Sequence, residues 1–166
     1  MSDYPFFYAI KPRKFHFDTY YKIFITETDF RGAKIAGQLM DEESVEVHFN
    51  FRGLLGVALS IVLERWAYKF VKLRYKTEKW YDEKIDIMDG KFLSVDKANF
   101  SYLPETIESV KIKRKSNFHT GFVNNSGVIE FYINDGSREK YIIYPIQDMD
   151  EIKENIAALI MNIEVE

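Results

Sequence analysis

A row of basic residues is the feature of this 166-residue chain whose residue type and spacing most directly suggest chemistry. The row consists of Arg65, Lys69, Lys72, Lys76 and Lys79. Steps of three and four residues place side chains on one face of an α-helix. A helix with such a face can lie on an anionic membrane, whose phosphate groups attract the cations. The commoner explanation, which the sequence alone favours, is the solvated face of a core helix that needs no ligand.

Aromatic and apolar residues accompany the basic row. Trp66, Phe70 and Leu73 recur at helical spacing in the same segment, and Phe51 precedes it. From these two sets we assign a candidate interaction face: Phe51, Arg65, Trp66, Lys69, Phe70, Lys72 and Lys76. Its expected partner is a protein or peptide, a second copy of this chain in a homo-oligomer, or an anionic membrane surface.

Histidine and cysteine supply neither a metal site nor a nucleophile. His16, His48 and His119 are far apart in the sequence and form no HxxxH or HExxH motif. The chain has no cysteine, which excludes disulfides, thiolate metal ligands and a cysteine nucleophile. We therefore predict no metal site.

Other catalytic signatures are equally weak. Asp86, Asp89 and Asp96 miss the spacing of a calcium-binding loop, and the Asp-Gly pair at 89–90 is typical of a turn. The segment RGAKIAG lacks the GxGxxG spacing and is better explained as a twisted or bulged strand. No serine lies in a nucleophile elbow. We therefore predict no catalytic residues and no cofactor, and a small enzyme with an unrecognised site is the least favoured option.

Composition restricts the class of protein. Hydrophobic residues make up 46% of the chain and aromatic residues 16%, enough for a packed core and too many for a disordered segment. The net charge of -3 argues against a nucleic-acid-binding protein that depends on phosphate contacts. Near the N-terminus the basic side chains follow the apolar cluster, the reverse of a secretory signal. We expect a cytoplasmic location, with peripheral contact to a membrane as the alternative.

One long helix must carry the basic row. The ten residues from Leu54 to Leu63 are apolar except for Gly56 and Ser60. At a rise of about 1.5 Å per residue they span roughly 15 Å, about half a bilayer core, so they do not cross a membrane. We predict a helix over residues 54–79 whose apolar start is covered by its own sheet, by a second copy of the chain or by lipid.

Strands are expected on both sides of this helix. Period-2 alternation and β-branched residues predict strands at 20–26, 30–39, 44–51 and 107–113. Asp-Gly pairs predict hairpins at 89–90 and at 135–136. The first 14 residues, interrupted by Pro5 and Pro12, are expected to form an extended arm or an edge strand.

The chain is expected to end in an amphipathic helix over residues 148–163. Asp148 and Glu151 have the spacing of a capping box. Apolar residues then recur on one face: Met149, Ile152, Ile156, Leu159, Ile160 and Ile163. No repeat or long linker divides the chain, so residues 1–166 are predicted to form a single domain.

The order of these parts resembles the PH-like and GRAM-like domains of bacteria and archaea. The resemblance rests on the strand-turn-strand IFITETDFRGAKIAG, the block FSYLPETIESVKI, the hairpin GVIEFYINDGSREKYII and the closing helix. It implies an α+β fold in which the C-terminal helix closes a strongly bent antiparallel sheet, or a partly open barrel, of about seven strands. The long helix over 54–79 is an insertion into this plan.

The resemblance also implies a class of function. Phosphoinositide-binding PH domains carry a basic loop between their first two strands. The corresponding loop here is Glu27, Thr28 and Asp29, acidic where a phosphate would need Lys or Arg. We therefore expect a non-catalytic interaction module that binds a protein or peptide or associates with itself. Binding to a membrane through the helix at 54–79 is the alternative.

Overall fold

The computed structural model describes residues 4–13, 18–37, 54–116, 125–145 and 147–166. The predicted strand at 44–51, which includes Phe51, and all three histidines lie outside these ranges. For residues 54–64, 66, 67 and 70 the description covers the backbone alone.

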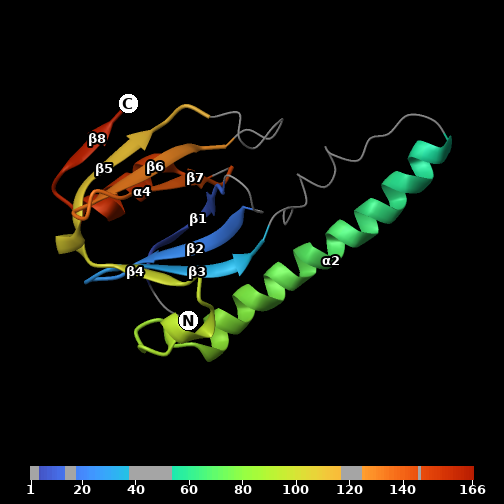
Figure 1. Cartoon of the computed structure of the whole chain (residues 1–166), viewed down its shortest axis with the longest axis horizontal. Helices are drawn as coiled ribbons and strands as arrows, with labels where there is room; N and C mark the ends of the chain where they lie inside the picture. The colour runs from blue at the N-terminus through green and yellow to red at the C-terminus, as the bar shows by residue number, and fades with distance from the viewer. Residues whose placement is uncertain (1–3, 14–17, 38–53, 117–124, 146) are drawn as a thin grey trace.

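Within the described ranges, eight strands form one open sheet whose edges are β4 and β8 (Figure 1). They are β1 (Phe6–Lys11), β2 (Thr19–Ile25), β3 (Phe30–Ala36), β4 (Phe100–Tyr102), β5 (Ile107–Lys113), β6 (Gly127–Ile133), β7 (Arg138–Ile143) and β8 (Ile163–Val165). Their order across the sheet is β4-β3-β2-β1-β7-β6-β5-β8. Neighbours pair antiparallel, except that β8 runs parallel to β5. The prediction of about seven antiparallel strands is therefore corrected to a mixed sheet, because the C-terminal residues add a strand.

β1 lies in the middle of the sheet, between β2 and β7, so the prediction of an arm or an edge strand is wrong. The prolines flank the paired residues: the Pro5 carbonyl accepts a hydrogen bond from the Ile25 N–H, and Pro12 follows the last residue of β1. Phe7 and Ala9 are fully buried. A proline outside the ladder removes no hydrogen bond from it, so β1 is free to be a central strand.

The inner face of the sheet packs against α4 (Met149–Ala157). Its core includes Phe7, Tyr21, Ile23, Val110, Ile129 and Phe131 from the strands, with Met149, Ile152 and Ile156 from α4. The Asp148 side chain accepts hydrogen bonds from the N–H groups of Asp150 and Glu151. Asp148 therefore caps the helix, as its spacing predicted.

α4 is shorter than the predicted helix over 148–163. It ends at Ala157, the chain turns, and Ile163–Val165 forms β8 beside β5. Ile160 is buried in the core that α4 covers, and Ile163 packs against the same core. The apolar spacing thus continues into residues that reach this core from a turn and a strand, which periodicity alone does not distinguish from a helix.

The outer face of the sheet packs against the C-terminal part of α2 (Leu54–Lys84) and against α3 (Phe92–Val95). This second core includes Tyr20, Phe24, Ala33, Ile35, Tyr81, Ile87 and Phe92. α2 begins at the predicted residue and ends at Lys84, beyond the predicted Lys79. Figure 1 shows that its first half extends away from the sheet, so the sheet faces only part of the helix.

The two Asp-Gly pairs adopt different structures. The pair at 135–136 forms the predicted hairpin between β6 and β7, with a φ of 83° at Gly136. The pair at 89–90 forms a turn that leads into α3, so the predicted hairpin there is wrong. Ile87 and Phe92, on the two sides of this turn, are both buried in the outer core, and this packing takes the place of strand pairing.

β3 contains the bulge that RGAKIAG predicted. Tyr20 pairs with Ala36 while Tyr21 pairs with Lys34, so β3 has one extra residue at this point. A Cβ atom at Gly32 would lie 2.1 Å from the ring of Phe100 on β4. The first glycine of the segment is therefore required by the close approach of an aromatic ring.

Candidate interaction surface

Buried charges attach α2 to the sheet. The Lys22 ammonium on β2 lies 3.0 Å from both carboxylate oxygens of Asp82 and 3.3 Å from a carboxylate oxygen of Glu78. The side chains of Lys22 and Glu78 are 6% and 12% exposed, so water screens their attraction weakly. The Tyr8 hydroxyl on β1 donates a hydrogen bond to Glu78. These groups hold one side of α2 against β1 and β2.

Arg74 lies on the same side of α2, one helical turn before Glu78. Its guanidinium carbon is 5.3 to 5.6 Å from the ring centres of Tyr8, Tyr20, Tyr75 and Tyr144. Aromatic rings at such distances attract a cation through their quadrupoles. Because Arg74 is buried among these rings, it defines the side of α2 that faces the sheet.

The hydrogen bond between Tyr8 and Glu78 also bears on the protonation state of Tyr8. Burial raises the pKa of the Tyr8 hydroxyl well above its ordinary value of 10, and the hydrogen bond to the Glu78 carboxylate raises this pKa further. The hydroxyl therefore stays protonated at neutral pH and remains a donor to Glu78.

The basic row lies on the side of α2 opposite to Arg74. We call Arg65, Lys69, Lys72, Lys76 and Lys79 the basic ridge, and all five residues are exposed. At about 100° per residue they occupy an arc of roughly 80° around the helix axis. The ridge is about 21 Å long, since each residue rises about 1.5 Å. Five positive charges therefore lie along one solvent-facing line.

Large apolar side chains border the basic ridge on both sides. Helical geometry places Tyr68 and Tyr75 along one border and Leu73 and Trp80 along the other. Their exposed fractions range from 39% for Tyr68 to 55% for Leu73. We call these four residues the apolar flanks. Tyr68, Tyr75 and Trp80 were not predicted for this face, although their steps of three and four from basic residues were an available signal.

The structure places most of the predicted interaction face on α2. Arg65, Lys69, Lys72 and Lys76 share its exposed side. Trp66 and Phe70 belong to the same helix, but their side chains, like Phe51, lie outside what the structure describes. The ridge ends at Lys79, whose ammonium is 3.6 Å from the Glu83 carboxylate. Both members of this pair are exposed, so it weakens the positive charge of the ridge only at its end.

The acidic loop at 27–29 stabilises its own turn. Asp29 is 2% exposed, accepts hydrogen bonds from the Thr26 and Ser101 hydroxyls, and pairs with Arg31 at 2.7 Å. Burial alone would raise the pKa of Asp29, but these hydrogen bonds and the Arg31 charge hold it below its ordinary value. The loop joins β2 and β3 rather than the first two strands, because the N-terminal residues form β1.

The described residues contain no group of three His, Asp or Glu side chains arranged to hold a metal ion. Among the described helices, none is long and apolar enough to cross a membrane. Comparisons of the chain with protein-family models, with curated proteins and with solved structures found no match. Function is therefore inferred from the chemistry of this chain's own surface.

Proposed function

We propose that this protein is a non-catalytic binding module of PH-like type that attaches to an anionic membrane surface through α2. The observation that carries the proposal is the exposure of the whole basic ridge between two apolar flanks. Lys22 and the rings around Arg74 hold the opposite side of α2 against the sheet. The ridge therefore faces away from the rest of the molecule, where a flat surface can approach its full length.

The PH-like assignment is supported by the order and packing of the elements. An open and mainly antiparallel sheet carries α4 against its inner face, and α4 follows the last hairpin of the chain. α2 lies between β3 and β4, as an insertion in the chain of strands. This order agrees with the plan that the sequence phrases resemble.

The charge pattern suits an anionic leaflet. A Lys or Arg close to such a surface contributes about 1 kcal/mol, so the five cations of the ridge together supply several kcal/mol before ordering costs. The rings of Tyr68, Tyr75 and Trp80 belong to the side-chain types that settle at the membrane–water interface. On the N-terminal side of the ridge, α2 includes residues 54–63, which are apolar in sequence except for Gly56 and Ser60.

Co-sedimentation with vesicles tests the proposal. We expect the chain to bind vesicles that contain phosphatidylserine and not to bind vesicles of pure phosphatidylcholine. The variant Lys69→Glu/Lys72→Glu/Lys76→Glu reverses three ridge charges and should lose most of this binding. The matched control, Lys91→Glu/Lys97→Glu/Arg138→Glu, changes the net charge equally at exposed sites outside α2 and should keep the binding.

Two outcomes would contradict the proposal. Equal loss of binding in both variants would mean that net charge governs the interaction rather than the ridge. Failure of the unmodified chain to bind either kind of vesicle would favour the other partner predicted from the sequence, a protein or peptide, which would need an acidic surface to match the ridge.

Self-association is a second candidate function, favoured by the first half of α2. Figure 1 shows this half extending away from the sheet, and its residues 54–63 are apolar except for Gly56 and Ser60. A second copy that packs against this segment would remove apolar surface from water. Light scattering should then show a dimer that dissociates on dilution, and Leu59→Lys should favour the monomer. A monomer at every concentration would contradict this function.

A further inference from the structure

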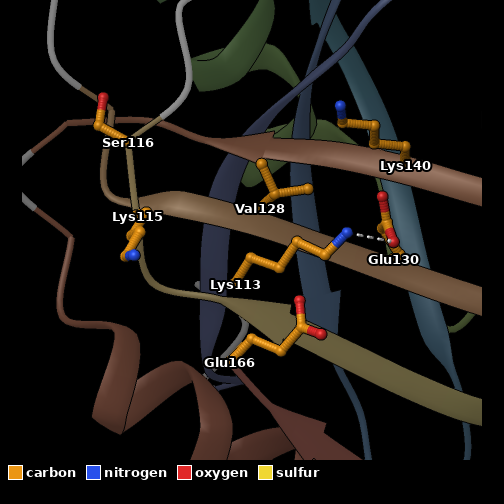
Figure 2. Close-up of a pocket in the computed structure, with 7 residues that line it drawn as sticks. All are labelled: Lys113, Lys115, Ser116, Val128, Glu130, Lys140 and Glu166. Atoms are coloured by element: carbon orange, nitrogen blue, oxygen red, sulfur yellow. Dashed lines mark hydrogen bonds and ion pairs between the residues drawn. The ribbon is translucent and has the colours of Figure 1, made fainter.

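A pocket lies on the part of the sheet that includes β5, β6 and β7, next to the end of β8. Figure 2 shows this pocket, which has a volume of about 350 Å³. It is lined by Lys113, Lys115, Ser116, Val128, Glu130, Lys140 and Glu166. Small-molecule sites usually measure about 300 to 1,000 Å³, so this volume suits a compact ligand. The basic ridge contributes no residue to the pocket. Binding of a ligand in the pocket therefore does not depend on the proposed contact between the ridge and a membrane.

The two carboxylates in the lining already have cationic partners. The Glu130 side chain is 4% exposed and lies 3.2 Å from the Lys113 ammonium (Figure 2). Glu130 also accepts a hydrogen bond from the Tyr132 hydroxyl. Glu166 lies 2.5 Å from the Lys111 ammonium. These contacts compensate the charge of both acids.

Among the described residues, Lys115 and Lys140 are the two lysines of the lining that form no ion pair with its acids. Within the part of the chain that the structure describes, the carboxylates of the lining pair with Lys111 and Lys113 instead. Ser116 accepts a hydrogen bond from the Asn125 N–H at 3.1 Å, which leaves its hydroxyl hydrogen for donation to a ligand. The lining includes three lysines and two glutamates, so it has a net charge of +1, and Ser116 adds a hydroxyl donor.

We propose that this pocket binds a small molecule that carries a phosphate monoester. Such a group has a charge of about -1.5 to -2 at pH 7, so the three lysines and the net positive charge of the lining attract it. Lysine binds phosphate as a point charge on a flexible stem. Lys115 and Lys140 stand at two ends of the pocket (Figure 2), so positive charge lies at both ends of the space for a ligand. Val128 offers an apolar surface to the organic part of the ligand.

An NMR titration of the full chain with glycerol 3-phosphate tests this site. Glycerol at the same concentration serves as the uncharged control. We expect saturable shifts of the amide signals at 113–116, 127–130 and 140. The variant Lys115→Ala/Lys140→Ala should weaken binding at least about tenfold, and it should remain folded because both side chains lie at the surface of the pocket. The matched control Lys91→Ala/Lys97→Ala removes two exposed lysines elsewhere and should bind as the unmodified chain does.

Two further probes separate the possible sources of the phosphate. Inorganic phosphate should bind more weakly than glycerol 3-phosphate, and equal affinity would overturn the assignment of an organic ligand. Vesicles that contain phosphatidic acid should leave glycerol 3-phosphate bound if the ligand is a free metabolite. Displacement by these vesicles would assign the same phosphate chemistry to a lipid headgroup. Absence of saturable shifts, or unchanged affinity in the double variant, would overturn the site.

Discussion

Lys22 and Arg74 determine which side of α2 faces the sheet. Apolar residues such as Val71 and Tyr81 are also buried on this side, but apolar contacts alone tolerate small rotations of a helix. A buried cation restricts the rotation of a helix more strongly, because it loses its hydration and must meet a partner in a defined geometry. Lys22 meets two carboxylates of α2, and Arg74 meets three tyrosine rings from outside α2. The exposure of the basic ridge follows from this constraint.

Lys22→Met should lower the free energy of unfolding by roughly 2 to 3 kcal/mol, because Glu78 and Asp82 lose their cation. The loss is smaller than for a fully buried pair, since the Asp82 side chain is 29% exposed. The control is Lys79→Met, whose exposed pair with Glu83 should contribute less than about 0.5 kcal/mol. Urea unfolding of both variants measures the difference. Equal stability would show that apolar packing alone holds α2 in place.

Asp29 should make the fold sensitive to acid. Its pKa in the folded chain lies below the ordinary value of 3.8, so the carboxylate stabilises the fold above that value. This contribution is lost as the pH falls through the pKa of the folded state. Asp29→Asn should therefore lower the melting temperature at neutral pH and flatten its decline below about pH 4. The control Glu27→Gln changes an exposed residue of the same loop, and its melting temperature should fall with decreasing pH as steeply as that of the unmodified chain. An equally steep fall in Asp29→Asn would contradict the role given to the Asp29 carboxylate.

Among the elements, those with a complete local signal were predicted well. β5 coincides with the predicted strand at 107–113, and the hairpin at 135–136 has paired strands on both sides. The Asp-Gly pair at 89–90 has the same local signal, but Ile87 and Phe92 are buried against α2 instead of pairing. β8 has no local signal, because it depends on pairing with β5. Tertiary contacts decide both of these elements, and a short sequence window does not contain them.

The candidate surface was predictable only in part for the same reason. Steps of three and four residues were sufficient to place the basic ridge on one face of a helix. Whether that face meets the sheet or the solvent depends on β1 and β2, which supply Tyr8 and Lys22 to the opposite side of α2. The pocket beside β5 was not predicted, because its lining comes from four strands or their ends and has no common spacing in the sequence.

Gly127 marks the point where β6 begins too close to β5 for any side chain. Its φ is 132°, and a Cβ atom there would lie 2.2 Å from the Lys113 carbonyl oxygen. Gly127→Ala should therefore lower the free energy of unfolding by more than about 2 kcal/mol. Gly37→Ala is the control, since no atom lies within 4 Å of a Cβ at that position. Urea unfolding should separate the two variants, and a stable Gly127→Ala would contradict the close approach of β5 and β6.

For the whole molecule, the net charge does not describe the local charge that a binding partner would meet. The chain has a net charge of -3, yet five of its 23 basic residues form one exposed line on α2. The remaining surface is correspondingly more acidic. If the proposed membrane contact forms, an anionic surface would attract the ridge and repel the rest, which would orient the molecule with α2 toward the lipid. The pocket on β5, β6 and β7 shares no lining residue with the ridge.

Salt should separate the electrostatic part of membrane binding from the apolar part. The Debye length falls from about 10 Å at 0.1 M to about 3 Å at 1 M, so attraction through the basic ridge should weaken strongly over this range. The chain has two tryptophans, and Trp66→Phe leaves Trp80 of the apolar flanks as the only one. Its fluorescence should shift to shorter wavelength when vesicles with phosphatidylserine are added at low salt, because its ring enters the interface. The shift should disappear at about 1 M salt, because salt screens the attraction between the ridge and the lipid. Binding without any shift of the Trp80 emission would show that the apolar flanks stay in water and that the ridge alone contacts the lipid.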